Sequence, residues 1–304
     1  MKPDTTVQLC SIELRNPLIL AAGVLGISAE TMKRVVDSGA GAVITKSMGV
    51  KARKGHPAPN VVEVESGLLN AMGLPNPGIE QMSTEIGKLA KSGIPTFASV
   101  YGFSPEEYAT AAQSASSAGA LAVELNVSCP NVADVGFEIG QNAEMVAEVT
   151  EAVKAKVDRP VIVKLSPNVT DIVEIGKAAE RSGADGVTAV NTLRGMAIDA
   201  ETRMPVLGAG RGGLSGPVIK PVALRCVYEL YDSLRIPIIG CGGITSWKDA
   251  VEFILAGATA LQIGTALMYR GMSVFREINR GMTSYMKRNR FGRIEEMRGS
   301  AHKR

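Results

Sequence analysis

The stretch Ser182-Gly183-Ala184-Asp185-Gly186-Val187-Thr188-Ala189-Val190-Asn191 decides the fold, because it joins the end of a predicted helix to a predicted strand. A small residue followed by glycine is typical of a helix C-terminus, where glycine adopts the left-handed conformation that ends the helix. The mostly aliphatic segment that follows is short and lacks regular alternation, as in a parallel strand buried on both faces. The stretch therefore predicts one helix-to-strand unit of an α/β protein.

The same unit recurs along the chain as a weak internal repeat. Ser38-Gly39-Ala40 precedes residues 42–46, Ala118-Gly119-Ala120 precedes residues 122–126, and Ala256-Gly257-Ala258 precedes residues 261–264. Four other predicted strands begin after a proline, which is tolerated at the first position of a strand. They span residues 18–20, 96–100, 161–164 and 238–240. Helical patterns between the strands cover residues 29–37, 105–117, 142–157, 171–181, 217–231 and 247–255.

Eight strands alternating with about eight helices predict a single (β/α)8 TIM barrel of the α/β class. The length of 304 residues and the lack of a composition break make residues 1–304 one expected domain. A doubly wound open sheet is the alternative. Residues 7–13 predict a small N-terminal β extension at the bottom of the barrel. Ser104, Thr170 and Ser246 are the expected N-caps of three helices, and Glu107 and Asp249 complete approximate capping boxes.

Composition and charge exclude several classes of protein. The net charge of +3 is weak, and the basic residues near the C-terminus favour a solvated tail over a nucleic-acid contact. The four cysteines lack Cys-x-x-Cys spacing, so neither a zinc site, an iron–sulfur cluster nor a disulfide framework is expected. The N-terminus does not resemble a signal peptide, and no apolar run has the length of a membrane span. We therefore expect a cytoplasmic protein without a metal.

Polar residues end most of the predicted strands, where barrel enzymes carry their chemistry. These residues are Lys46, Ser47, Ser99, Asn126, Lys164, Ser166, Asn191 and Thr192. The lower halves of the same strands are expected to be almost wholly aliphatic. A single asparagine of this kind usually caps a turn, and a single lysine usually extends to water. Two lysines and two asparagines at one barrel mouth instead indicate a site for an anionic or electron-rich ring with amide groups.

The last two strand ends are rich in glycine. Gly240-Cys241-Gly242-Gly243-Ile244 ends the seventh strand, and Gly264-Thr265 ends the eighth. Glycine lets backbone N–H groups approach a phosphate closely, and barrels often bind phosphate at these two loops. The alternative is a pair of ordinary tight turns.

The segment Asn126-Val127-Ser128-Cys129-Pro130-Asn131 follows the fourth strand and places a cysteine at the barrel mouth. An isolated cysteine is more often an inert buried thiol, but the flanking asparagines and the lysines of the mouth favour a proton-transfer role. The only histidines are His56 and His302, and neither lies at a strand end. A Cys–His hydrolase is therefore not expected.

Over about residues 9–285, the chain resembles the class 1 dihydroorotate dehydrogenases, and most closely class 1B. The resemblance rests on Thr45-Lys46-Ser47, Asn70-Ala71-Met72-Gly73-Leu74, the Asn-Val-Ser-Cys-Pro-Asn segment, Val163-Lys164-Leu165-Ser166-Pro167, residues 191–199, residues 212–216 and the two glycine loops. The Asn-Thr-Leu-x-Gly-Met-x-Ile-Asp pattern is the class 1B feature. The cysteine distinguishes the chain from class 2, which uses serine as the base.

This resemblance implies oxidation of dihydroorotate to orotate in de novo pyrimidine (UMP) biosynthesis. Cys129 would take the proton from carbon five, and the hydride on carbon six would pass to FMN, with Lys164 stabilising the reduced flavin. Residues implied to hold the substrate are Lys46, Asn70, Ala71, Met72, Gly73, Leu74, Asn126, Asn131, Asn191 and Thr192. Residues implied to bind one FMN are Ala22, Lys46, Ser47, Ser99, Asn126, Lys164, Val190, Gly216, Gly242, Gly243, Gly264 and Thr265.

Three positions depart from the family pattern. Serine is usual where Ala22 stands, asparagine often occupies the position of Ser99, and Cys241 is commonly methionine or another apolar residue. None of the three removes a catalytic group. Gly136 and Gly140, which follow the cysteine, are either hinges of a closing loop or ordinary turn residues.

The resemblance also implies a homodimer in a heterotetramer with an iron–sulfur subunit, which would carry FAD and a 2Fe-2S cluster and pass electrons to NAD. Two alternatives stay open. One is a dihydropyrimidine dehydrogenase-type FMN barrel acting on uracil or thymine, against which Lys46 argues because those substrates have no carboxylate. The other is a non-catalytic barrel subunit that binds a phosphate ligand.

Overall fold

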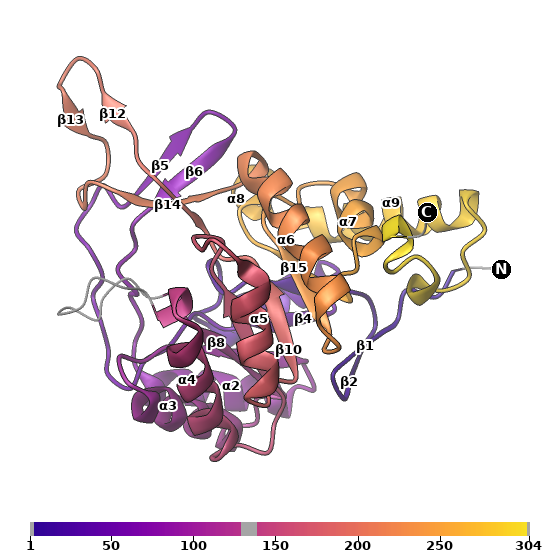
Figure 1. Ribbon diagram of the computed structural model, residues 1–304, viewed down its shortest axis with the longest axis horizontal. Helices are drawn as coiled ribbons and strands as arrows, with labels where there is room; N and C mark the ends of the chain where they lie inside the picture. Colours follow the sequence, from indigo (N-terminus) through magenta and orange to yellow (C-terminus); the bar gives the residue numbers. More distant parts are fainter. Residues whose placement is uncertain (1–2, 129–138, 303–304) are drawn as a thin grey trace.

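A ring of eight parallel strands forms the centre of the molecule, in a computed structural model that describes residues 3–128 and 139–302 (Figure 1). The ring closes where the last strand pairs with the first, with Leu261 opposite Leu18. Its strands, in chain order, are β3 (Leu18–Leu20), β4 (Ala42–Ile44), β7 (Thr96–Val100), β8 (Ala122–Asn126), β9 (Val161–Leu165), β10 (Gly186–Ala189), β15 (Ile238–Cys241) and β16 (Ala260–Ile263). The predicted barrel is confirmed, and the open sheet is excluded by the closure.

Helices cover the outside of the ring, and successive helices such as α3, α4 and α5 pack against one another. They are α1 (Ala29–Asp37), α2 (Ile79–Lys91), α3 (Pro105–Ser117), α4 (Ala143–Lys154), α5 (Ile172–Arg181), α6 (Lys220–Ser233), α7 (Trp247–Leu255), α8 (Ala266–Arg270) and α9 (Ser273–Arg288). Short 3-10 turns are η1 (Ile139–Gln141), η2 (Pro217–Ile219), η3 (Ile294–Glu296) and η4 (Ser300–His302). Among the described residues, no helix combines the length and the apolar character that a bilayer crossing requires.

Two of the three predicted N-caps are confirmed. Ser246 and Asp249 form a reciprocal capping box at α7, and Ser104 accepts a hydrogen bond from the backbone N–H of Glu107 at α3. The prediction of Thr170 is wrong, because Asp171 caps α5. Its carboxylate accepts from the backbone N–H groups of two residues in the first turn, so this helix begins one residue later than expected.

The N-terminal extension is a hairpin of β1 (Val7–Leu9) and β2 (Ile12–Leu14), as predicted. Cys10 lies in its turn, and the Cys10 thiol donates to the carbonyl of Asp185 at 3.2 Å. Asp185 immediately precedes β10, so the hairpin lies at the amino-terminal end of the barrel strands. Leu9 and Leu14 are fully buried there. The hairpin therefore covers the bottom of the barrel with apolar side chains.

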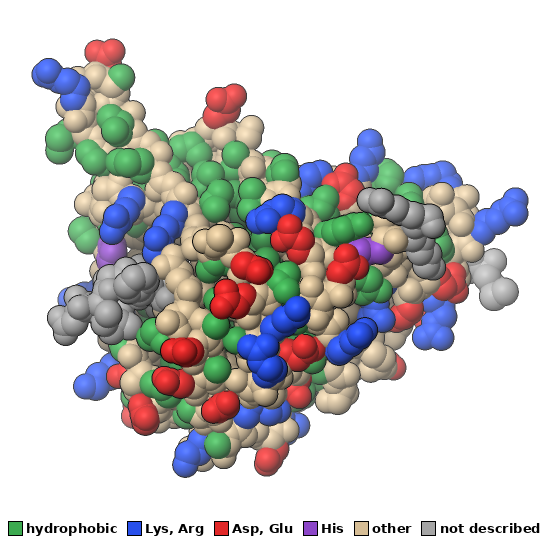
Figure 2. All heavy atoms as spheres, viewed as in Figure 1, with side chains coloured by type: hydrophobic (Ala, Val, Ile, Leu, Met, Phe, Trp, Pro, Cys, Tyr) green, Lys and Arg blue, Asp and Glu red, His purple; other side chains and the backbone are tan. Residues whose placement is uncertain are grey.

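A four-stranded antiparallel sheet, which the sequence did not predict, forms from loops at the opposite end of the barrel. Its order is β11 (Leu193–Gly195), β14 (Gly212–Ser215), β6 (Gly67–Asn70) and β5 (Val61–Val64). A second small hairpin, β12 (Ile198–Asp199) with β13 (Met204–Pro205), projects beyond it (Figure 1). Exposed Met196, Ile198 and Met204 give this projection an apolar surface, visible in green at the upper left of Figure 2.

Candidate active site

Side chains from four strand ends form a continuous hydrogen-bonded chain at the carboxyl end of the barrel. The hydroxyl of Ser99 lies 2.8 Å from that of Ser47, which accepts from the Asn126 amide nitrogen at 3.1 Å. The amide oxygen of Asn126 accepts from the amide nitrogen of Asn191 at 3.0 Å. The amide oxygen of Asn191 accepts in turn from the backbone N–H of Thr192. Residues separated widely in sequence thus share one polar surface.

Asn70 joins this surface through the antiparallel sheet. Its amide nitrogen donates to the carbonyl of Gly213 at 3.1 Å, and the two residues are paired between β6 and β14. Glycine is required at position 213, because a Cβ atom there would lie 2.2 Å from the hydroxyl oxygen of Thr192. The sheet therefore brings Asn70 and Thr192 to either side of one glycine.

Lys46 follows β4 directly beside Ser47 and is half-buried. Its backbone N–H donates to the carbonyl of Gly26 at 2.8 Å, which fixes the start of this loop. Burial lowers the pKa of the Lys46 ammonium below its usual value. No salt bridge joins Lys46 to an acidic side chain in the described part of the chain, so its charge can meet an anionic ligand.

Lys164 is more buried than Lys46 and lies among polar side chains that were not predicted from the sequence. Its ammonium donates to the amide oxygen of Gln262 at 2.7 Å and lies 3.7 Å from the carboxylate of Glu124. The Glu124 carboxylate also accepts from the hydroxyl of Thr188 at 3.0 Å and from the Gln262 amide nitrogen. The expectation of almost wholly aliphatic lower strands is therefore wrong at three positions. The sequence did contain a signal for this cluster, namely a polar residue within each of three otherwise aliphatic strands.

The charge state of Lys164 reflects opposing influences. Burial, the largest of them, lowers the pKa of the ammonium, whereas the Glu124 carboxylate raises it through its charge and a hydrogen bond, and a Cys241 thiolate would raise it further. Burial raises the pKa of the Cys241 thiol, which therefore stays protonated near neutral pH. Glu124 is then the negative charge that keeps Lys164 an ammonium ion.

The glycine loops also lie at the barrel mouth, but glycine is needed at their positions for different reasons. Gly216, Gly242 and Gly243 all have positive φ angles, and a Cβ on Gly242 or Gly243 would collide with α6. These three glycines are explained by the backbone alone. Gly264 has no such constraint, because a Cβ there would meet only Ala21, at an ordinary 3.4 Å. The hydroxyl of the next residue, Thr265, donates to Ser215 at 2.8 Å.

Other predicted residues line the surroundings of this surface. Ala22 is buried just after β3, and Val190 is buried after β10, where its N–H donates to the carbonyl of Cys241 at 2.7 Å. Ala71, Met72, Gly73 and Leu74 continue from Asn70 into a loop. This loop is tied to residues 53–60 by bonds such as that from the Ala71 N–H to the carbonyl of Asn60, at 2.8 Å.

Cys129, Asn131 and Gly136 lie outside the described residues, and their predicted roles stay predictions. The chain on either side is well anchored, because the N–H of Gly140 donates to the carbonyl of Val127 at 2.8 Å. The hydroxyl of Ser128 is buried and has no hydrogen-bond partner among the described residues. This bond holds the described residues on the two sides of the segment, Val127 and Gly140, next to each other.

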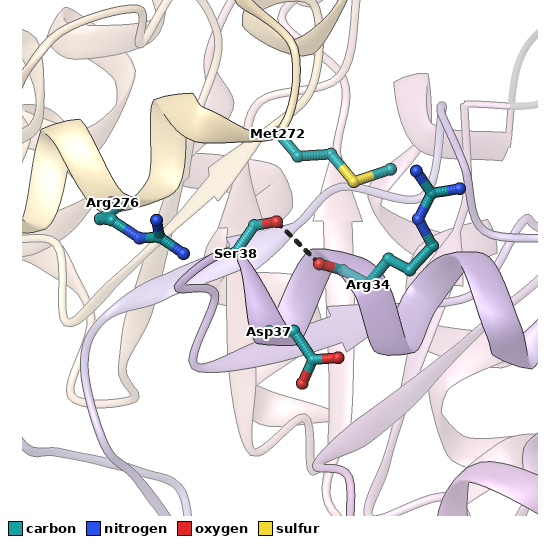
Figure 3. Close-up of a pocket in the computed structure, with 5 residues that line it drawn as sticks. All are labelled: Arg34, Asp37, Ser38, Met272 and Arg276. Carbon is teal, nitrogen blue, oxygen red and sulfur yellow. Dashed lines mark hydrogen bonds between the residues drawn. The ribbon is translucent and has the colours of Figure 1, made fainter.

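A surface hollow of about 570 Å³ lies elsewhere, between the end of α1 and the start of α9 (Figure 3). Its lining residues are Arg34, Asp37, Ser38, Met272 and Arg276. The hydroxyl of Ser38 donates to the carbonyl of Arg34 at 2.8 Å. None of the five residues belongs to the strand-end surface, so the hollow is separate from the candidate site.

Comparison with known proteins assigns the family. The family model described as dihydroorotate dehydrogenase matches residues 5–286. The catalytic subunit of dihydroorotate dehydrogenase B (NAD(+)) from Pyrococcus abyssi is 52% identical over 297 residues, which are 98% of this chain and 99% of that protein. The protein of the same name from Methanothermobacter thermautotrophicus is 51% identical over 97% of both chains. The predicted resemblance to class 1B is confirmed, and the chain belongs to the dihydroorotate dehydrogenase family.

Proposed function

We propose that this chain oxidises dihydroorotate to orotate in de novo pyrimidine biosynthesis, with FMN as the hydride acceptor and Cys129 as the base. The observation that carries the proposal is the joined surface of Asn126, Asn191, Thr192 and Asn70 beside two lysines, in a chain of this family. The relatives that match over nearly their whole length are named as catalytic subunits of dihydroorotate dehydrogenase B (NAD(+)).

The substrate proposal follows from the chemistry of these groups. A dihydroorotate ring presents amide N–H donors and carbonyl acceptors in one plane, and asparagine side chains offer both kinds of partner. The ring also carries a carboxylate, for which Lys46 supplies a positive charge. Asn70, Asn126, Asn191 and Thr192 would orient the ring, together with Asn131 and the loop from Ala71 to Leu74.

The mouth fits FMN by three features of its own residues. The bare backbone at Gly264 leaves room for close approach by a phosphate, Ser47 and Ser99 offer hydroxyls, and Lys164 offers a buried positive charge. The residues that would hold FMN are Ala22, Lys46, Ser47, Ser99, Asn126, Lys164, Val190, Gly216, Gly242, Gly243, Gly264 and Thr265. When bound, FMN supplies the two-electron chemistry that protein side chains lack.

The protein's own part in the reaction is to move a proton and to stabilise charge. Cys129 would accept the proton from carbon five as the hydride leaves carbon six, so its sulfur must be a thiolate at that moment. Lys46 would bind the substrate carboxylate, and the asparagines would fix the orientation of the substrate ring. Lys164 would stabilise the negative charge that accumulates at the other side of the mouth.

The test is a spectrum of the purified protein. We expect bound FMN, released on denaturation, and loss of its visible absorbance when dihydroorotate is added without oxygen. Dihydrouracil should leave the absorbance unchanged, since it has no carboxylate for Lys46. A colourless protein would support the non-catalytic barrel, and bleaching by dihydrouracil but not by dihydroorotate would support the dihydropyrimidine alternative.

The C129A variant tests the base separately. It should keep the FMN absorbance of the wild-type protein but lose almost all bleaching by dihydroorotate, because binding is retained and proton removal is not. C226A is the control for removal of a cysteine that has no proposed role, since Cys226 is buried in α6. Undiminished bleaching by C129A would refute the assignment of the base.

We further propose that the chain works as a cytoplasmic homodimer bound to a second subunit that carries FAD and a 2Fe-2S cluster and reduces NAD. The name "catalytic subunit" of the relatives supports such a partner. The described cysteines, which form no disulfide, suit a reducing compartment. Native mass measurement of the complex from the source cells tests this assembly, and a barrel that is isolated in those cells would contradict it.

A further inference from the structure

A compact polar cluster lies inside the barrel, beneath the mouth, and the reaction proposed above uses only one of its members. Glu124 and Thr188 are fully buried, Gln262 is 1% exposed and Lys164 is 7% exposed. The four residues come from β8, β10, β16 and β9, and they contact one another across the barrel interior. Burial of four polar side chains without a role for three of them calls for a physical explanation.

Hydrogen bonding within the cluster determines which way the amide of Gln262 faces. A carboxylate only accepts hydrogen bonds, so the amide nitrogen of Gln262 must face Glu124. The amide oxygen is then left to accept from Lys164, at 2.7 Å. Glu124 therefore positions Lys164 in two ways. It acts indirectly, by orienting Gln262, and directly, since its carboxylate lies 3.7 Å from the ammonium.

The charges in the cluster depend on the same carboxylate. The strands around Lys164 present Glu124 from β8, Cys241 from β15, and the uncharged Thr188 and Gln262 from β10 and β16. With the Cys241 thiol protonated, Glu124 is the one described anion that faces the ammonium. One of its oxygens, Oε1, is buried and accepts no hydrogen bond from a described residue, so its electrostatic interaction with Lys164 is not shared with another donor.

We propose that Glu124 is a positioning residue for the flavin site: it holds Lys164 charged and, through Gln262, fixes the position of the ammonium group beneath the barrel mouth, and so sets the reduction potential of the bound flavin. This inference rests on the proposed FMN site. It adds that the effect of Lys164 on the flavin depends on Glu124 of β8 and Gln262 of β16, and not on Lys164 alone.

Substitution E124Q separates this role from simple core packing, because it keeps the size of the side chain and removes the charge. Without its counter-charge, the buried Lys164 should lose its proton at a lower pH than in the wild type, because burial penalises the ammonium. Reduction of the flavin would then restore that proton, since an ammonium stabilises the added negative charge. The reduction equilibrium should therefore gain up to a tenfold dependence per pH unit, which is about 30 mV for a two-electron couple.

The measurement is the midpoint potential of the bound flavin between pH 6 and 9, in the purified protein. E124Q should show the additional pH slope, and E124D, which restores the charge, should largely remove it. The double variant E124Q/K164M should lack the additional slope, because the titrating group is gone. E229Q is the matched control for net charge, since Glu229 forms an exposed pair with Arg225 on α6.

The outcomes distinguish this inference from the proposed function. A wild-type slope in E124Q, in a protein where K164M alone shifts the potential, would overturn the role of Glu124 and leave the FMN site intact. A wild-type chain that binds no flavin would instead overturn the proposed function.

Thermal unfolding of the flavin-free protein gives a second measurement, which does not depend on activity. In E124Q the buried lysine must either stay charged without its partner or give up its proton, and both cost stability, so Tm should fall by roughly 5 °C or more. E124Q/K164M should recover part of that loss. If E124Q yields no folded protein, recovery of folded protein by the double variant supports the pairing. A double variant no more stable than E124Q refutes it.

Discussion

Lys46 is the residue whose charge should decide which dihydropyrimidine the site accepts. A charged hydrogen bond to a carboxylate contributes about 1.5–3 kcal/mol, so K46M should raise KM for dihydroorotate by roughly 10- to 150-fold. Flavin content should change less than KM. Steady-state kinetics with K51M as the control, an exposed lysine five residues along the chain, checks this result. An unchanged KM in K46M would mean that another cation holds the carboxylate.

The pKa of Lys46 adds a pH dependence with a defined sign. Because burial lowers this pKa, the ammonium loses its proton at a lower pH than an exposed lysine does. The attraction for the substrate carboxylate is complete at low pH and weakens as pH rises. KM for dihydroorotate should therefore increase on the alkaline side in the wild type, and this increase should vanish in K46M.

Cys10 should link the stability of the fold to alkaline pH. Burial raises the pKa of the Cys10 thiol to about 12, from an ordinary value of 9.0. The unfolded chain therefore loses this proton above about pH 9 while the folded chain keeps it, so stability is complete below pH 9 and declines between 9 and 12. Each such proton steepens the decline by about 1.4 kcal/mol per pH unit. Urea unfolding of C10S from pH 8 to 11 should show a shallower decline than the wild type, and an identical decline would contradict this account.

Single residues also mark the limit of what sequence could predict at the site. Asn126 and Asn191 were predictable because strand ends of a barrel converge, whatever the details of packing. The role of Glu124 was not, because its partner Gln262 lies 138 residues away and only the closed barrel brings the two together. A charged residue in an aliphatic strand was visible in the sequence, but nothing there showed what it faces.

Among the elements, the loop after β15 depends on a carboxylate in the following helix. Asp249 of α7 accepts from the N–H and hydroxyl groups of Thr245 and Ser246, and Lys220 of α6 donates to it at 2.8 Å. These bonds hold the chain immediately after Gly243. The capping box is therefore also an anchor for the proposed phosphate loop.

Substitution D249A should consequently affect both stability and flavin binding. Loss of the cap and of the loop anchor should lower the free energy of unfolding by about 2 kcal/mol and should also weaken FMN affinity. S104A is the matched control, since it removes the N-cap of α3 at a cost of about 1 kcal/mol but holds no glycine loop. Urea titration and fluorescence titration with FMN measure the two effects. Equal FMN affinity in both variants would show that Asp249 acts on the helix alone.

The elements of the barrel were predictable, whereas those of the antiparallel sheet were not. Barrel strands are aliphatic and follow regular glycine or proline signals, so local pattern is enough to find them. By contrast, β6 and β14 are short, contain glycine and pair across 143 residues at Asn70 and Gly213. Their stability comes from long-range pairing, which local propensity does not record.

At the scale of the whole molecule, closure joins the two ends of the chain. Strand β16 pairs with β3, the N–H of Asp4 donates to the carbonyl of Gly292 at 2.9 Å, and α9 packs on α7. The sequence predicted eight strands but could not by itself distinguish a ring from an open sheet, since both have the same local pattern. The pairing of Leu261 with Leu18 makes that distinction.

Because neither half of the barrel is complete without the other, we expect the flavin-free protein to unfold in one cooperative transition. Trp247, the only tryptophan, lies at the start of α7 against Gly281 of α9 and reports on the closing segment. Its fluorescence and the far-ultraviolet circular dichroism should therefore change at the same urea concentration. Added FMN should shift both together, by about 2.7 kcal/mol at one hundred times its Kd. A tryptophan transition that precedes the loss of helix would show that the last βα units separate first, and the chain would then be a ring of semi-independent parts.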